Sequence, residues 1–185
     1  MKRFILLSML LCVLCGCKAE NTQLNQAMEI RSALLSAKEC HFTAEITADY
    51  GTELHQFMVD CQGNSQGNLQ FTVTQPETIA DISGTVSDSG GSLKFDDTIL
   101  YFPLMAEKQL NPVSAPWIFL KTLRSGYITS ACREGTLLHL TINDSYEEDA
   151  LRVDIWIEED RPVQADVLFD GKRILSLKIA EYTLL

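Results

Sequence analysis

The sequence predicts an α+β fold: a large curved antiparallel β half-barrel with an N-terminal helix and a short mid-chain helix on its concave face. Most of the chain alternates apolar and polar residues with the two-residue period of a strand, and only two segments have a helical period. Nearly every predicted strand has one apolar and one polar side, whereas strands of parallel sheets between helices are apolar on both sides. Because two helices cannot cover a flat sheet of about nine to eleven strands, we expect the sheet to curl around them.

The first residues of the chain are typical of a signal peptide. A basic start, Met1-Lys2-Arg3, is followed by an apolar run of about eleven residues at 4–14. This run is too short to span about 30 Å of hydrocarbon as a helix, but it matches the hydrophobic region of a secretion signal. We therefore expect the protein to leave the cytoplasm.

The end of this run resembles the lipobox of bacterial lipoprotein precursors. It reads Leu14-Cys15-Gly16-Cys17, a leucine and two small residues before a cysteine. The resemblance implies that residues 1–16 are removed, that Cys17 is lipidated and that residues 17–23 form a lipidated tether. We therefore expect an extracytoplasmic protein that is anchored to the cell membrane. If the cell has two membranes, we expect the outer one, because lysine rather than aspartate follows the anchor. The alternative is an ordinary secretion signal cleaved at a small residue.

The charge of the chain argues against nucleic acid as a partner. The whole sequence has a formal net charge of −10, and removal of residues 1–16 leaves 13 basic and 25 acidic residues. A surface with this excess of carboxylates repels phosphate backbones and anionic lipid headgroups. We expect no nucleic-acid binding, and contact with the membrane only through the N-terminal lipid.

Residues 24–38 form the first predicted helix. Their apolar side chains lie within one arc of about 160° at 100° per residue, which is the pattern of an amphipathic helix. Arg31 and Lys38 lie inside the same arc. Their stems can lie along the apolar surface while their charged heads reach water. The alternative is that Arg31 points its charge into a cavity.

From residue 42 onward the period changes to that of strands. The predicted strands have their apolar sides at residues 42–48, 57–61, 69–73, 80–86, 93–95, 138–142, 151–157, 163–169 and 175–179. Asp170-Gly171, between the last two, is a strong signal for a hairpin turn. Trp156 lies on the polar side of its strand, where either a loop covers it or it belongs to an exposed contact patch. No linker separates these segments, so residues 24–185 are expected to form a single domain.

A short helix interrupts the strands at residues 117–124. Ser114 is suited to cap its N-terminus, Pro116 lies in the first turn, and Gly126 can end it in the left-handed conformation. We expect this helix to pack on the concave face of the sheet, together with the N-terminal helix.

The order of these elements resembles the LolA/LolB-like lipoprotein-carrier superfamily, over essentially all of residues 24–185. Three segments look like those of small lipoproteins of this type from anaerobic Gram-positive bacteria: Glu39-Cys40-His41-Phe42-Thr43-Ala44-Glu45-Ile46, Ala115-Pro116-Trp117 and Asp154-Ile155-Trp156. The resemblance implies a concave hydrophobic surface that can hold acyl chains, lidded by helices. No functional residue of the family matches a position of this chain, and the anchor is closer to the membrane-tethered acceptors than to the soluble carriers.

Two functions of different kinds follow from this fold. The first is a membrane-anchored, non-catalytic binding module for a lipid or other apolar ligand. The alternative is a structural or interaction lipoprotein with a filled core and no small ligand, whose protein partner the sequence does not identify. An unfilled cavity under helix 24–38 favours the first, and dense packing there favours the second. The residues expected to line an acyl-chain groove are Phe42, Phe57, Phe71, Trp117 and Phe169, with Arg31 added if its charge points inward.

The sequence contains no motif of a common enzyme class. It has no GxSxG, HExxH, phosphate-binding loop or dinucleotide fingerprint. The acidic residues that begin at Asp144 fall in a loop and lack the spacing of an EF-hand. His41, His55 and His139 are scattered singly, and Cys132 has no evident histidine partner. We therefore expect no metal site, no cofactor and no catalysis.

Cys40 and Cys61 are predicted to form a disulfide. With Cys132 they make an odd number of mature cysteines besides the anchor, so one thiol stays free or pairs between chains. A four-residue turn at 49–52 places Cys40 directly opposite Cys61, and a two-residue turn places Cys61 opposite Phe42 and diagonal to Cys40. Directly opposed Cβ atoms lie about 4.5–5.5 Å apart, so the first register is favoured. The alternative is a pair of reduced, buried cysteines.

Overall fold

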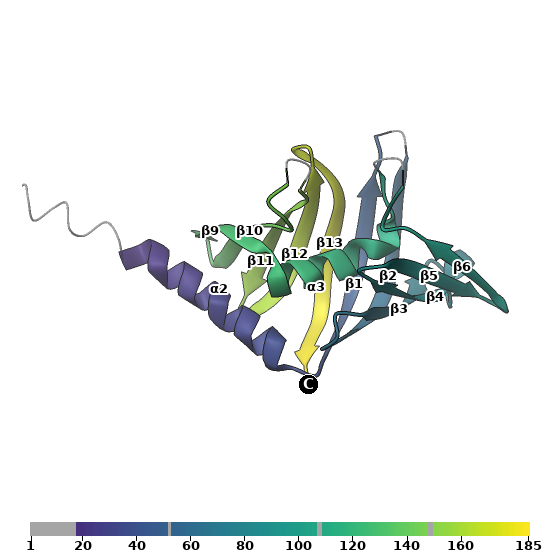
Figure 1. Cartoon of the computed structure of the whole chain (residues 1–185), viewed down its shortest axis with the longest axis horizontal. Coiled ribbons are helices and arrows are strands. Elements are labelled where there is room, and N and C mark those ends of the chain that lie inside the picture. Colours follow the sequence, from purple (N-terminus) through teal and green to yellow (C-terminus); the bar gives the residue numbers. More distant parts are fainter. Residues whose placement is uncertain (1–17, 52, 107–108, 148–149) are drawn as a thin grey trace, which may run out of the picture.

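The structure is a computed structural model that describes residues 18–51, 53–106, 109–147 and 150–185. In this part of the chain, eleven strands form one open antiparallel sheet, and two α-helices lie across it (Figure 1). The strand order is β6-β5-β4-β3-β2-β1-β13-β12-β11-β10-β9, so the first and last strands of the chain pair in the middle of the sheet. This architecture confirms the predicted α+β half-barrel.

A strand lies at each of the nine predicted positions, and the structure adds four more at residues 98–102, 105–106, 109–110 and 127–134. The first helix covers Lys18–Ser36 rather than residues 24–38, so residues 18–23, predicted as part of a tether, are helical. The helices are α2 (Lys18–Ser36), α3 (Ala115–Ser125) and the 3₁₀ turns η2 (Glu77–Ile79) and η3 (Pro112–Ser114). The sheet consists of β1 (Glu39–Asp49), β2 (Leu54–Asn64), β3 (Leu69–Gln75), β4 (Ser83–Ser87), β5 (Gly90–Phe95), β6 (Thr98–Phe102), β9 (Tyr127–Glu134), β10 (Leu137–Asn143), β11 (Arg152–Glu158), β12 (Arg161–Phe169) and β13 (Lys172–Leu184), and β7 (Met105–Ala106) pairs separately with β8 (Gln109–Leu110). The edge strands β6 and β9 were not predicted, because both of their sides are largely exposed and their residues do not alternate.

The alternation of apolar and polar residues decides which face of the sheet is covered. In β1 every second residue from Cys40 to Ala48 is buried, and those between them are partly exposed. In β10 the buried residues are Leu138, Leu140 and Ile142. Successive side chains of a strand point to opposite faces, so the buried set meets on the concave side. Each large apolar side chain buried there stabilises the fold by about 1.5–3 kcal/mol.

Helix α3 packs on the concave face and is buried along most of its length. Its Trp117 Nε1 donates to the carbonyl of Gly67 at 2.8 Å. The Arg124 guanidinium donates to the carbonyls of Asn64 and Ser65, both at 2.9 Å. These bonds tie the helix to the turn between β2 and β3.

The ends of α3 differ from the prediction in two details. Ser114 makes no side-chain capping bond, because its own backbone is already helical, and Asn111 instead accepts a bond from the N–H of Val113 at the start of η3. Gly126 ends the helix at φ −70°, outside the left-handed region, with its N–H donating to the Thr122 carbonyl at 2.8 Å.

Helix α2 buries a narrower stripe than the sequence predicted. It contacts β9 and α3 at one side of the sheet (Figure 1). The residues that pack inward are Ala27, Ile30 and Leu34, while Leu24, Met28 and Leu35 are 40–51% exposed. Within the described residues, no helix combines the length and apolar character that a membrane span requires.

Arg31 joins the two helices. Its Nε donates to the Leu123 carbonyl at 2.7 Å and its Nη2 to the Gly126 carbonyl at 2.9 Å. These carbonyls lie at the C-terminal end of α3, where a helix leaves acceptors unpaired and carries partial negative charge. Burial lowers the pKa of Arg31. The charged head therefore satisfies a helix end and does not point into a cavity.

The turn between β1 and β2 produces the second of the two registers considered for the cysteines. Cys61 pairs with Phe42 and Cys40 with Gly63, so the favoured register is wrong. Both cysteines are buried free thiols in this structure, and Cys132 is an exposed free thiol. Burial raises the pKa of Cys40 to about 11 and that of Cys61 well above its usual value. The predicted disulfide is not formed, and the two thiols pack as small apolar side chains.

Replacing Arg31 with methionine is expected to destabilise the fold. Arg31→Met keeps an unbranched stem but removes both donors to the end of α3, each a charge-assisted hydrogen bond to a part-buried acceptor. We expect the free energy of unfolding in urea to fall by about 2 kcal/mol. The control is Arg161→Met on the exposed start of β12. Equal urea midpoints for the two variants would contradict the role assigned to Arg31.

Candidate functional site, an apolar groove

A groove with a volume of about 760 Å³ opens at the β2–β6 end of the sheet. Ligand pockets for small molecules range over about 300–1,000 Å³, so it has the size of a binding site. Its lining is mostly apolar and consists of Tyr50, Leu54, His55, Gln56, Phe57, Val73, Pro76, Ile79, Ile82, Leu93, Phe102, Pro103, Leu110, Asn111, Pro112 and Val113. We call this site the apolar groove.

Four parts of the chain build its walls, and one of them is the β5–β6 hairpin. Strands β2 and β3 contribute Phe57 and Val73, which face the concave side by strand alternation. The turn around η2 contributes Ile79 and Ile82, and the segment that leads into α3 closes the other side with Leu110. Because α3 begins only at Ala115, no helix covers this end of the concave face within the described residues.

A glycine allows one wall of the groove to form. Gly91 in β5 pairs with Phe102 in β6. A Cβ atom on Gly91 would lie 2.2 Å from the Phe102 ring, far closer than van der Waals contact. The missing side chain therefore lets the aromatic ring lie against the sheet, where it lines the groove.

The polar groups at the groove already have partners in the protein. The Tyr50 hydroxyl donates to the Leu110 carbonyl at 2.5 Å, and burial raises the pKa of Tyr50. His55 Nε2 lies 3.2 Å from a Glu53 carboxylate oxygen, and the Gln56 amide donates to Glu45. The described residues that line the groove include no lysine or arginine. The groove therefore offers apolar surface rather than a partner for an anionic headgroup.

Of the six residues predicted to bind a ligand, the structure places only Phe57 in the apolar groove. Phe42 packs edge-on against Phe119 of α3, with ring centroids 5.8 Å apart. Phe71 is buried where Gly84 leaves room for its ring. Trp117 and Arg31 make the hydrogen bonds described above, and Phe169 packs against the core from β12. These five lie where helices or neighbouring strands already fill the concave face.

Sequence reasoning missed most of the groove because its residues lie in irregular segments. Ile79, Ile82, Leu110 and Val113 belong to turns or short elements that show no period of two or 3.6. One signal was present: the missed apolar residues stand near Pro76, Pro103 and Pro112, which also line the groove.

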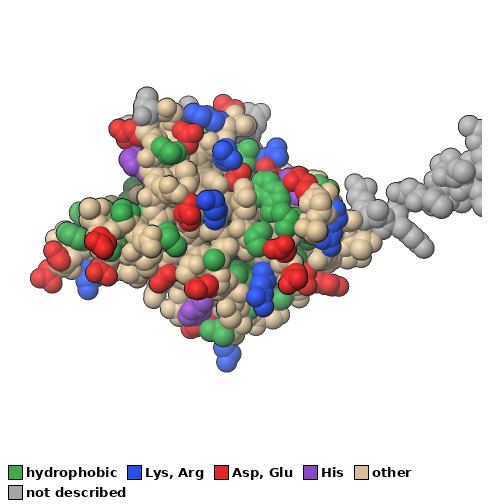
Figure 2. All heavy atoms as spheres, turned by 180° about the vertical axis from the view of Figure 1, so that it is seen from behind, with side chains coloured by type: hydrophobic (Ala, Val, Ile, Leu, Met, Phe, Trp, Pro, Cys, Tyr) green, Lys and Arg blue, Asp and Glu red, His purple; other side chains and the backbone are tan. Residues whose placement is uncertain are grey.

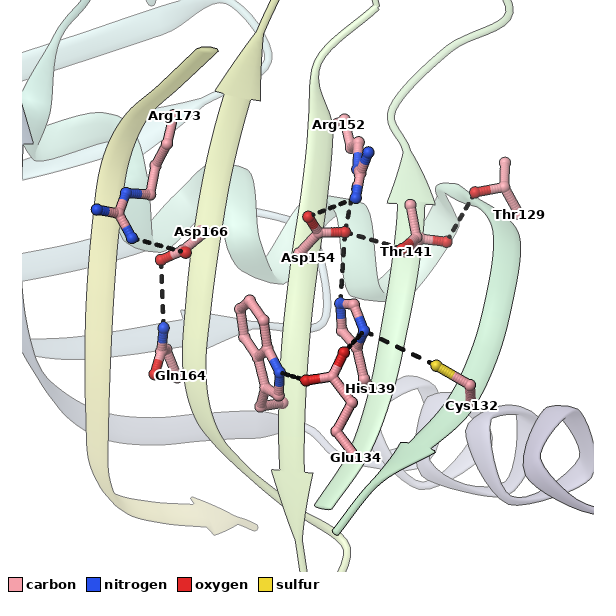
Figure 3. Close-up of polar contacts among 11 residues, drawn as sticks. Thr129, Cys132, Glu134, His139, Thr141, Arg152, Asp154, Gln164, Asp166 and Arg173 are labelled. Carbon is pink, nitrogen blue, oxygen red and sulfur yellow. Dashed lines mark hydrogen bonds and ion pairs between the residues drawn. The ribbon is translucent and has the colours of Figure 1, made fainter. Parts of the chain in front are cut away.

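The outward face of the sheet carries a second cluster that the sequence did not reveal (Figure 3). Cys132, expected to lack a histidine partner, pairs across the β9–β10 hairpin with His139. Its Sγ lies 3.9 Å from His139 Nδ1, and a Glu134 oxygen lies 2.7 Å from the same nitrogen. The expectation of a solitary Cys132 is therefore wrong, because β9 was not predicted as a strand. Trp156 stacks on this histidine, so a side chain of the adjacent strand, and not a loop, packs against its ring. Figure 2 views the molecule from this outward side, where acidic and basic side chains are interspersed.

Comparisons with known proteins find similarity of fold only. No protein-family model and no curated protein matches the chain. Among solved structures, a putative outer membrane lipoprotein-sorting protein domain from Vibrio parahaemolyticus has a TM-score of 0.46 and 7% identity, over 89% of this chain and 93% of that one. A LolA superfamily protein from Nitrosomonas europaea has a TM-score of 0.45 and 7% identity, with coverage of 86% and 93%. Lipoprotein LppX from Mycobacterium tuberculosis has a TM-score of 0.41 and 12% identity, with coverage of 87% and 93%.

Proposed function

We propose that this protein is an extracytoplasmic lipoprotein that binds one apolar ligand, of the acyl-chain class, in the apolar groove. The observation that carries the proposal is the groove itself: about 760 Å³ of mostly apolar lining at the end of the concave face that α3 leaves uncovered. The polar residues of its lining, His55, Gln56 and Asn111, already bond within the protein, so the apolar surface supplies the affinity. No step of catalysis is part of this proposal.

The energetics are adequate for reversible binding. Each CH₂ group moved from water into an apolar site contributes about 0.8 kcal/mol, so the roughly fourteen of a palmitic acid chain contribute about 11 kcal/mol. Loss of translational and rotational freedom opposes this gain by several kcal/mol. A ligand held mainly by one acyl chain is therefore expected to bind in the micromolar range or weaker, as a protein that takes up and releases its ligand requires.

The proposal places the domain at a membrane. The predicted anchor, Cys17, lies outside the described residues and directly precedes α2. A diacylglyceryl group brings two acyl chains, which suffice for stable anchoring without help from an acidic surface. Because α2 packs at the β9 side of the sheet, the anchored end of the domain is opposite the end that holds the groove (Figure 1).

A second candidate function rests on the packing elsewhere on the concave face. Phe119 and Leu123 of α3 are fully buried, and Leu34 of α2 is only 2% exposed. The space under the helices is therefore largely filled, apart from a pocket of about 180 Å³ that Leu35 and Trp117 line, and this packing favours the structural or interaction lipoprotein considered above. The two candidates differ in one respect: only the first needs the groove to accept a ligand.

Filling the groove is expected to abolish ligand binding. Ile82→Trp adds an indole to a partly buried position in the lining. We expect the affinity for the neutral fluorescent probe N-phenyl-1-naphthylamine to fall at least about tenfold, which is about 1.4 kcal/mol. Palmitic acid should displace this probe from the unmodified protein.

The matched control is Ile174→Trp, which changes the same residue type at a partly buried position outside the groove. This variant is expected to keep the affinity of the unmodified protein. Equal binding by both variants, or no binding of either the probe or palmitic acid to the unmodified protein, would reject the groove as a ligand site and leave the interaction lipoprotein.

Removal of the predicted anchor is expected to block lipidation. Cys17→Ser deletes the thiol that would accept the diacylglyceryl group, so the precursor should keep residues 1–16 and incorporate no acyl chain. Mass spectrometry of the protein from a lipoprotein-processing bacterial host measures both properties. The control is Cys15→Ser, which keeps a small residue before Cys17. Normal acylation of Cys17→Ser would show that the lipobox assignment is wrong.

A further inference from the structure

The geometry points to a zinc-binding site on the outward face of the sheet, formed by Cys132, His139 and Glu134. A thiolate, an imidazole and a carboxylate are the three donor types that zinc binds in proteins. One donor atom from each residue lies within 4.8 Å of the other two. We call this group the Cys–His–Glu cluster.

The β9–β10 hairpin brings the three donors together. Its register pairs Cys132 directly with His139 and Glu134 with Leu137. Cys132 and Glu134 are two residues apart in one strand, so their side chains share a face. Leu138 and Leu140 on either side of His139 are buried in the core, which places the histidine on the opposite, outward face. The cluster is therefore on the other side of the sheet from the apolar groove and is independent of it.

The distances between donors suit a tetrahedral ion. Zinc lies about 2.3 Å from sulfur and about 2.0–2.2 Å from nitrogen or oxygen, which places donors of one ion about 3–4 Å apart. The Cys132 Sγ to His139 Nδ1 distance is 3.9 Å. The Glu134 oxygen lies 2.7 Å from that nitrogen, closer than two donors of one zinc ion, and would move outward by a side-chain rotation when the ion binds. Three protein donors leave the fourth position to water.

A second layer of contacts holds the histidine in place (Figure 3). Trp156 stacks on the His139 ring with centroids 4.6 Å apart and planes within 4°, and its Nε1 donates to the second Glu134 oxygen at 2.8 Å. His139 Nε2 is buried and lies 3.5 Å from an Asp154 oxygen. A carboxylate facing the far nitrogen of a histidine ligand is a recurring feature of zinc sites, because it fixes the ring and its tautomer.

Asp154 is itself fixed in the sheet. The Asp154 side chain is 9% exposed, and the Arg152 guanidinium donates to both of its oxygens, at 3.1 and 2.8 Å. Thr141 donates to it at 2.8 Å. This buried carboxylate lies next to a buried imidazole nitrogen that has no hydrogen bond. It therefore holds the histidine ready to bind a metal ion, which a group of acidic residues on the surface would not do.

The protons balance when the ion binds. In the metal-free protein Nδ1–H of His139 can donate to Glu134, and with zinc on Nδ1 the ring proton resides on Nε2 and faces Asp154. The Cys132 thiol binds as a thiolate and releases its proton to solvent, since metal ligands must be deprotonated. No redox change takes place.

The same three residues could be taken for a nucleophilic thiol with a base, but the geometry favours the metal. A base must have a free nitrogen facing the thiol. The only His139 nitrogen that faces Cys132 is the one held by the Glu134 carboxylate at 2.7 Å. Because the Glu134 carboxylate occupies this nitrogen, His139 is hindered from taking the proton of the Cys132 thiol. For a metal ion, the same carboxylate is an additional ligand.

Cobalt(II) and zinc titrations test the site directly. All proteins carry Cys12→Ser, Cys15→Ser and Cys17→Ser, because those thiols would also bind zinc, and are kept reduced. We expect one equivalent of cobalt to bind with a thiolate-to-cobalt absorption band, quench Trp156 fluorescence and be displaced by zinc. Cys132→Ser should remove the thiolate band and weaken zinc binding at least about 100-fold, and Asp154→Asn should weaken it about 10–100-fold.

The matched control is His41→Ala. His41 lies 3.1 Å from Glu39 on the outward side of β1, a histidine–glutamate pair with no cysteine donor, and its loss should leave zinc binding unchanged. Circular dichroism and the urea midpoint verify that each variant is folded. Absence of zinc binding at millimolar concentration, or zinc affinity that Cys132→Ser leaves unchanged, would overturn the proposal.

Discussion

The apolar face of the eleven-stranded sheet is wider than two helices can cover, and the rest of the structure depends on this mismatch. The sheet curls so that α3 contacts strands on both sides of the β1–β13 pair, and the carbonyls at the end of α3 receive the Arg31 guanidinium from α2. The helices cover most of the apolar face there, with one pocket of about 180 Å³ beside Trp117. The helical cover stops at β3, where turns and prolines replace a helix and leave the apolar groove.

The parts of the fold that bury one face could be predicted from the sequence. In β1, β10 and β13 the alternation of apolar and polar residues is a direct consequence of burial on one side, so both the strand and its inward face were correct. The residues of β9 show no such alternation, because α2 covers only part of this strand and most of its residues are exposed. Cys132 consequently appeared solitary, although a strand at 127–134 and the Gly135 turn are what place it opposite His139.

The groove was less predictable for a different reason. Aromatic residues at alternating positions, such as Phe42 and Phe71, were natural candidates for a ligand site. The same alternation directs Phe42 against Phe119 of α3 and Phe71 against Gly84 of β4, so the protein itself is their partner. The residues left for a ligand come from segments without a period, and their meeting depends on where the sheet ends and α3 begins. The β1–β2 register was unpredictable in the same way, because two turns were compatible with the sequence. In the register that forms, Cys61 is opposite Phe42 and not opposite Cys40, and both thiols are free in the core.

Cross-linking with a photoactivatable acyl probe tests most directly whether the uncovered end of the concave face holds an apolar ligand. A fatty acid with a diazirine near the end of its chain is bound, irradiated and mapped by peptide mass spectrometry. Labels are expected on the segments that carry Ile79, Ile82 and Val113, and palmitic acid should suppress them. Labels confined to the exposed apolar residues of α2, such as Met28, or labels that palmitic acid does not suppress, would contradict a ligand site in the groove.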